Sequence, residues 1–158
     1  MERRKFAISV LKNKRRDSKA EFVNIVNQIY IETLGFLSRL SNRYQRLIAR
    51  DIIELASKVL DNCEEAQAIF PKDEVRKELR YRHLLEARAA LMALDVHMSH
   101  VYELMMKNPQ GCFMDSKGNS LPPAEAEKRL EKMAQSLGEK IDSENNLIQK
   151  VIASDKDR

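Results

Sequence analysis

The residues that break helices are confined to a few places in this chain of 158 residues. All four prolines lie at positions 71, 109, 122 and 123, and two of the four glycines lie among the last three of them. Proline lacks a backbone N–H, and glycine loses more conformational entropy than any other residue, so both are avoided inside helices. We therefore expect continuous helices between these positions and a loop at residues 108–122.

Apolar residues recur at intervals of three and four in each of these stretches, as on the buried face of a helix. Such rows predict helices from Ser18 to about residue 40, from 43 to 70, from 73 to 107 and from 123 to 153, the last interrupted by Glu144. The clearest is a heptad seam in the third helix. It consists of Leu84, Ala87, Leu91, Leu94, Met98, Val101 and Met105.

The expected helix ends carry capping residues. Ser18 and Glu21 form a capping-box pattern, and Asp73 is the expected N-cap of the third helix. Ser41 and Asn42 could end the first helix and cap the second, although the sequence leaves open whether the chain breaks or only bends there. Turn formers at 116–119 predict a small β-hairpin in the long loop.

These features predict an all-α fold, an antiparallel up-and-down four-helix bundle over residues 18–153. A basic N-terminal arm (1–17) would precede it, and a short tail (154–158) would follow. Charged residues make up 33% of the chain and hydrophobic ones 43%, which argues against both a membrane protein and a disordered one. The two cysteines fit a reducing compartment, and the absence of a signal-like apolar segment predicts a cytoplasmic protein.

The excess of basic residues is concentrated at the N-terminus. Residues 1–19 carry eight basic and two acidic side chains, a net charge of +6, whereas the whole chain has +4. Such an arm is typical of proteins that bind nucleic acid, and a solvated tail is the alternative. The candidate contact residues here are Arg3, Arg4, Lys5, Lys12, Lys14, Arg15 and Arg16.

A second basic feature is a row of arginines, Arg39, Arg43, Arg46 and Arg50, with no acid among them. The spacing of four, three and four places them opposite the expected buried row of the second helix. Guanidinium groups bind phosphate with a planar fork, so the row predicts a nucleic-acid contact; the alternative is a solvated face. If the chain breaks at 41–42, Arg39 leaves the row.

Two helices carry more apolar surface than one seam needs. Helices that are apolar on two sides are central in a protein or buried against another subunit, and a four-helix bundle has no central helix. We therefore expect a homo-oligomer. The second rows consist of Ala49, Ile53, Ala56 and Leu60, and of Leu85, Ala89, Met92 and Val96.

The sequence offers little support for an enzyme. It contains no Gly-rich phosphate loop, nucleophile elbow or zinc-protease motif. His97, His100 and Glu103 step by three, but no second helix supplies matching ligands, so we expect no metal site and no cofactor.

Three segments resemble a known group of small bacterial four-helix-bundle proteins. They are residues 40–47 (LSNRYQRL), 84–94 (LLEARAALMAL) and 133–141 (MAQSLGEKI). The group includes the ribosomal-RNA intervening-sequence proteins and the accessory variability determinant (Avd) of diversity-generating retroelements. The resemblance covers residues 22–152, and it implies a pentameric, basic, non-catalytic bundle that binds a reverse transcriptase and its template RNA or cDNA.

Carried onto this chain, the resemblance adds Arg76 and Arg80 to Arg39, Arg43, Arg46 and Arg50 as candidate contacts for nucleic acid or the polymerase. We therefore expect a non-catalytic accessory protein that binds RNA or DNA with little sequence preference. The alternative is a homo-oligomeric protein–protein scaffold without a nucleic-acid role.

Overall fold

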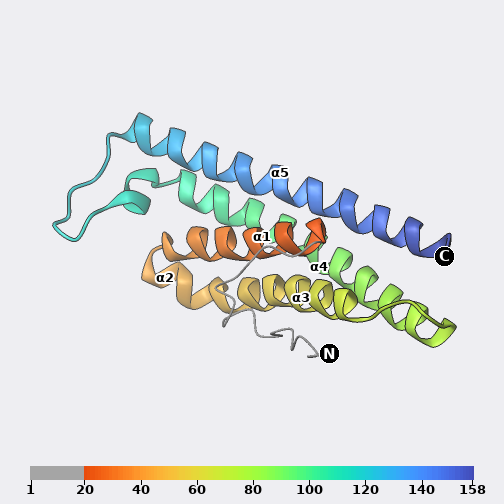
Figure 1. The fold of residues 1–158 in the computed structure, drawn as a ribbon. Helices are drawn as coiled ribbons and strands as arrows, with labels where there is room; N and C mark the ends of the chain where they lie inside the picture. The colour runs from red at the N-terminus through yellow and green to blue at the C-terminus, as the bar shows by residue number, and fades with distance from the viewer. Residues whose placement is uncertain (1–19) are drawn as a thin grey trace, which may run out of the picture.

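The computed structural model describes residues 20–158, which are mostly helical and contain no β-strand (Figure 1). The expected all-α class is confirmed. The four long helices are α1 (Glu21–Ser38), α3 (Arg50–Ala68), α4 (Glu74–Met106) and α5 (Pro123–Lys156). The short elements are α2 (Asn42–Tyr44), a π-helix η1 (Gln45–Ala49) and a 3₁₀-helix η2 (Pro109–Phe113).

Each long helix packs against two others. Helix α1 lies against α3 and α5, and α4 lies against the same two helices. The chain direction reverses from each long helix to the next, so that α1 and α4 run opposite to α3 and α5 (Figure 1). No helix in residues 20–158 is long and apolar enough to cross a membrane.

The hydrophobic core contains the whole seam predicted for the third helix. All seven residues, from Leu84 to Met105, are buried in α4. The row predicted for α5 is also mostly buried, but so is Glu144, the acid that interrupts it. At the two ends of the row predicted for the second helix, Tyr44 and Phe70 are exposed.

The caps decide where helices begin. The chain breaks after Ser38, and the hydroxyl of Ser41 accepts a hydrogen bond from the backbone N–H of Tyr44, which caps α2. The carboxylate of Asp73 accepts one from the N–H of Arg76 at 2.9 Å and caps α4 as predicted. Helix α1 is described from Glu21, and the predicted cap at Ser18 lies outside the described residues.

The second predicted helix is divided into α2, η1 and α3, which follow one another without a turn between them. In a π-helix each carbonyl accepts from the N–H five residues ahead, so η1 accommodates one residue more than an α-helical segment would in its place. The apolar spacing of the sequence did not predict the π-helix.

The predicted β-hairpin at 116–119 is not found: the part of the chain that the structure describes has no strand there. The loop between α4 and α5 instead forms η2 and then a tight turn. In this turn the N–H of Asp115 donates to the carbonyl of Asn119 at 2.9 Å. Gly118 has a φ of 80°, which favours glycine at this position. One Asp115 carboxylate oxygen also accepts from the N–H groups of Lys117 and Asn119.

Candidate nucleic-acid interface

Three members of the arginine row are exposed on consecutive short elements. Arg43 lies in α2, Arg46 in η1 and Arg50 at the start of α3. Arg50 forms an exposed i,i+4 ion pair with Glu54 at 3.3 Å. Such surface pairs contribute about 0.5 kcal/mol or less, so Arg50 can exchange this partner for a phosphate at small cost.

Arg39 has left the row, because the helix break places it in the turn after α1. Its guanidinium lies over the ring of Phe113, 4.6 Å from the centroid, and donates a hydrogen bond to the carbonyl of Cys112 at 3.1 Å. The guanidinium of Arg129, from α5, lies 5.9 Å from the same ring. The two cations therefore approach one phenyl ring from different helices, held by the favourable interaction of cations with aromatic faces.

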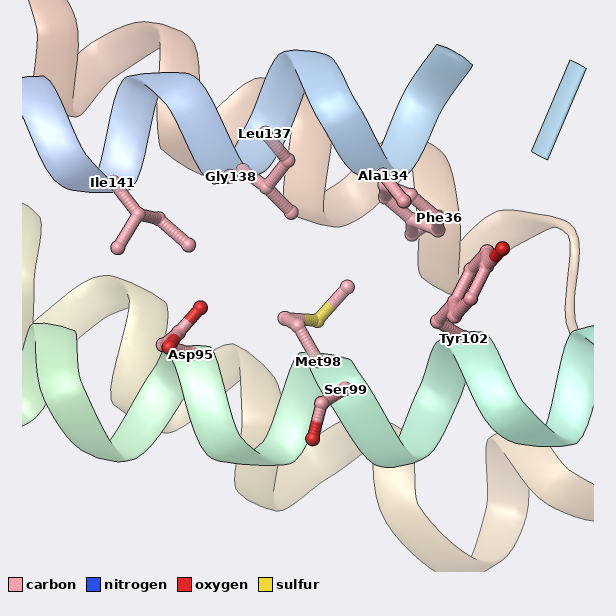
Figure 2. A pocket seen from close by; sticks show the side chains of 9 residues that line it. All are labelled: Phe36, Asp95, Met98, Ser99, Tyr102, Ala134, Leu137, Gly138 and Ile141. Atoms are coloured by element: carbon pink, nitrogen blue, oxygen red, sulfur yellow. The ribbon is translucent and has the colours of Figure 1, made fainter. Parts of the chain in front are cut away.

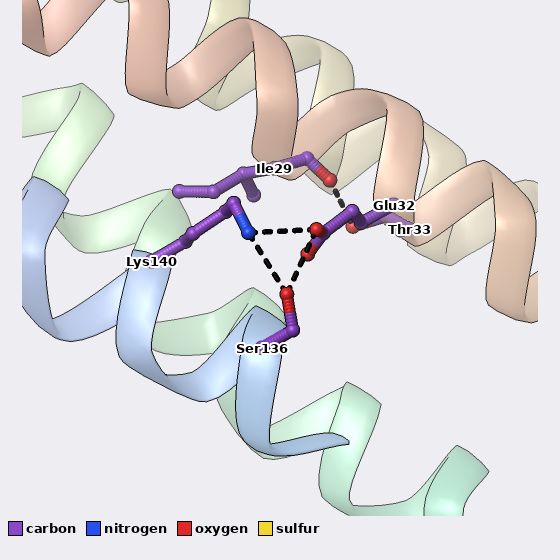
Figure 3. A network of polar contacts seen from close by, with 5 residues as sticks. All are labelled: Ile29, Glu32, Thr33, Ser136 and Lys140. Carbon is purple, nitrogen blue, oxygen red and sulfur yellow. Dashed lines mark hydrogen bonds and ion pairs between the residues drawn. The ribbon is translucent and has the colours of Figure 1, made fainter. Parts of the chain in front are cut away.

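A pocket of about 420 Å³ lies beside Arg39, between α1 and α5; we call it the α1–α5 pocket. Arg39 and Lys132 line it with Ser136 and Glu32, and Gly35, Phe36 and Met133 complete its wall. Figure 3 shows Glu32 of α1 facing Ser136 and Lys140 of α5. One Glu32 oxygen accepts from Lys140 Nζ at 2.8 Å and from Ser136 Oγ at 3.0 Å, which compensates the charge of Glu32.

Two arginines suggested by the resemblance are engaged within the protein. Arg76 pairs with Asp73, the N-cap residue of α4. Arg80 is buried: it pairs with Asp155 at 2.6 Å and donates to the carbonyls of Ala66 and Ile69. Arg80 ties the ends of α3 and α5 to α4, so the prediction that it contacts nucleic acid is wrong.

The two second apolar rows differ in exposure. On α4, Leu85, Ala89, Met92 and Val96 are all exposed and form a ridge, which we call the α4 ridge. On the second predicted helix, Ala56 is buried in the core, so its assignment to an interface is wrong. The other members of that row, Ala49, Ile53 and Leu60, are half-buried against the core.

A second, smaller cavity of about 210 Å³ lies between α4 and α5. Figure 2 shows Met98 of α4 pointing toward Leu137 and Ile141 of α5, with Asp95 nearby. Phe36 lines this cavity as well as the α1–α5 pocket. Its wall is mainly apolar and holds no basic residue, which makes it unsuited to phosphate.

The core contains one acid–thiol pair that the sequence did not suggest. Glu144 is 0% exposed, and one of its oxygens accepts a weak hydrogen bond from Cys63 Sγ at 3.9 Å, whereas the other has no partner. Burial raises the pKa of Glu144 to about 8, and burial likewise raises the pKa of the Cys63 thiol. A neutral thiol cannot act as a nucleophile, so this pair offers no chemistry at neutral pH.

His97 and His100 are exposed on α4, where their rings meet edge to face at 6.4 Å, whereas His83 is half-buried beside Asn62 and Glu65 of α3. Within residues 20–158, no group of three or more acids, histidines and cysteines is placed to hold a metal ion. The candidate residues of the N-terminal arm lie outside the described residues.

Three residues of this interface were missed by the sequence analysis: Phe113, Arg129 and Lys132. Each stands in the sequence without a recognisable motif, and only the fold brings it to Arg39, at least 74 positions away along the chain. The one available signal was Phe113 itself, an aromatic residue in a loop otherwise rich in turn formers.

Comparisons with known proteins identify no relative: no family model, no curated protein and no solved structure matches this chain.

Proposed function

We propose that this protein is a non-catalytic nucleic-acid-binding accessory factor, and that its partner is a reverse transcriptase of a diversity-generating retroelement. The observation that carries the nucleic-acid part is the set of exposed arginines Arg39, Arg43 and Arg46, none of which forms an ion pair in the described residues. Exposed cations without an ion-pair partner gain free energy from phosphate, because their binding releases the counterions of the phosphate.

The reverse transcriptase is proposed on the sequence resemblance alone. The residue patterns lead us to propose a cytoplasmic antiparallel four-helix bundle, and the resemblance leads us to propose that it assembles into a pentamer. An oligomer would align several arginine clusters along one strand, and such multivalency raises avidity without any new contact. The basic residues before Ser18 would add further contacts with phosphate groups.

The nucleic-acid role is tested by changing Arg43, Arg46 and Arg50 together to Ala. Affinity for a single-stranded RNA should fall for all sequences alike, and the slope of log K against log salt should decrease by about 2 if each arginine contacts one phosphate. A matched control replaces three exposed cations on other parts of the surface, Lys58, Arg82 and Lys150, by Ala. Equal affinity and equal salt slopes for the two triple variants would rule out the arginine cluster as a specific contact.

The polymerase partner is tested by co-expression with the reverse transcriptase that we propose as its partner. The two proteins should co-purify at low salt and separate only partly at moderate salt, because charges at the rim of an interface set its salt sensitivity more than its lifetime. Failure to co-purify with template RNA present would contradict this part of the proposal.

A second candidate function is a protein–protein scaffold. The exposed α4 ridge favours it, because apolar side chains in a continuous row mark interaction surfaces. If the protein is a scaffold, the variant with Arg43, Arg46 and Arg50 changed to Ala should retain every partner of the wild-type protein.

A further inference from the structure

The α1–α5 pocket combines an apolar wall with a cationic rim. Phe36 and Met133 line the apolar wall beside Gly35; Phe36 is buried in the core, so the half-buried Met133 provides most of the apolar surface that a ligand can reach. Arg39 and Lys132 provide two positive charges, while the charge of Glu32 is already matched by Lys140 at 2.8 Å. The lining therefore has a net positive charge next to a surface suited to a flat, weakly polar group.

Arg39 is held in place before any ligand arrives. The Phe113 ring lies beneath its guanidinium, and the carbonyl of Cys112 accepts one of its five N–H groups. These contacts use one face and one donor, so the remaining donors are available to an anion. Ordering an arginine in advance removes part of the side-chain entropy that binding would otherwise cost.

The size of the pocket limits what it can hold. A cavity of about 420 Å³ lies within the range of small-ligand sites, of a few hundred to about 1,000 Å³. A phosphate ion alone would leave its apolar wall uncovered, and a purely apolar ligand would leave both cations unused. A nucleotide satisfies both halves, because its base has an apolar face and its phosphate is anionic.

We propose that the α1–α5 pocket binds one nucleotide of a single-stranded nucleic acid, with the base against Met133 and the phosphate at Arg39 and Lys132. This inference rests on the proposed nucleic-acid function and adds a defined site to it.

The test fills the pocket without weakening the fold. A Cβ atom added at Gly35 meets nothing within 4 Å, and leucine is a better helix former than glycine, so Gly35→Leu should fold at least as stably as the wild type. The matched control is Gly138→Leu, which is equally unobstructed but fills the cavity between α4 and α5 instead. Binding of a fluorescent 12-nucleotide RNA is measured by anisotropy, and stability by urea unfolding.

We expect Gly35→Leu to bind the RNA about tenfold more weakly, as for the loss of one bound base, and Gly138→Leu to bind like the wild type. The double variant Arg39→Gln, Lys132→Gln should lower the salt slope by about 0.7 for a phosphate that both cations share. If Gly35→Leu binds the RNA with the affinity of the wild type, the proposed nucleotide site is wrong, whereas the proposed nucleic-acid function is not contradicted. If the wild-type protein itself fails to bind the RNA at low salt, the proposed function is overturned and the pocket with it.

Discussion

Replacing Glu144 by Gln should make the protein more stable at neutral and alkaline pH. Glu144 has no access to solvent and only the Cys63 thiol as a partner, so its charged form is costly to bury. Burial, reinforced by the charge of Glu21 on α1, raises its pKa from 4.5 to about 8, although the Cys63 hydrogen bond acts in the opposite direction. Gln has nearly the same shape and never ionises.

The sign follows from proton linkage. Between pH 4.5 and 8 the folded state holds a proton on Glu144 that the unfolded state has released, so the free energy of unfolding decreases as the pH rises. The slope approaches 1.4 kcal/mol per pH unit, which amounts to about 3 kcal/mol between pH 5 and pH 8. Above pH 8 both states are ionised and the dependence on this group ends.

The assay is urea unfolding followed by circular dichroism at pH 5, 6, 7 and 8, with a reductant present to keep Cys63 reduced. The difference in stability between Glu144→Gln and the wild type should grow by about 3 kcal/mol across this range. Glu131→Gln, an exposed acid on the same helix, controls for the loss of one negative charge. Parallel pH profiles for Glu144→Gln and the wild type would refute the reasoning.

Three further predictions concern single contacts. Arg80→Met should destabilise the protein by about 3 kcal/mol in urea unfolding, because it leaves Asp155 charged and unpaired while its side chain is only 15% exposed; the change should largely disappear when Asp155 is also replaced by Leu. Asp73→Ala should cost about 1 kcal/mol through the loss of the α4 cap, and Asp73→Ser should restore most of it. Met92→Glu should convert the oligomer that we propose into folded monomers by light scattering, because a carboxylate cannot be buried in an apolar interface without a partner; a wild-type protein that is itself monomeric would contradict this.

Local patterns were sufficient to predict most of the fold. The heptad seam of α4 and the cap at Asp73 depend on residues within one helix, and both are found as expected. The break near Ser41 was one of two alternatives, because a capping serine and a bent helix leave similar patterns in a sequence. The end residues Tyr44 and Phe70 follow the apolar spacing but are exposed, since no neighbouring element covers them there.

The candidate site depends on contacts between distant residues and was predicted only in part. The exposure of Arg43, Arg46 and Arg50 follows from helical spacing. The position of Arg39 over Phe113 and the burial of Arg80 against Asp155 result from packing between elements 73 or more positions apart. An arginine in the sequence looks the same whether its partner is solvent, a phosphate or a buried acid.

The π-helix between α2 and α3 gives this chain one surplus residue at the point where its arginines are displayed. Leu47, in the middle of η1, is 68% exposed, so its side chain contributes little to the packing of the core. Removing that residue would let the segment close as an ordinary α-helix and would leave Arg43 facing nearly the same direction, because the wider π turn already absorbs the surplus residue. The surplus residue therefore sets the spacing between Arg46 and Arg50 without turning the basic surface away from its present side of the helix, and a change of one codon is enough to alter that spacing.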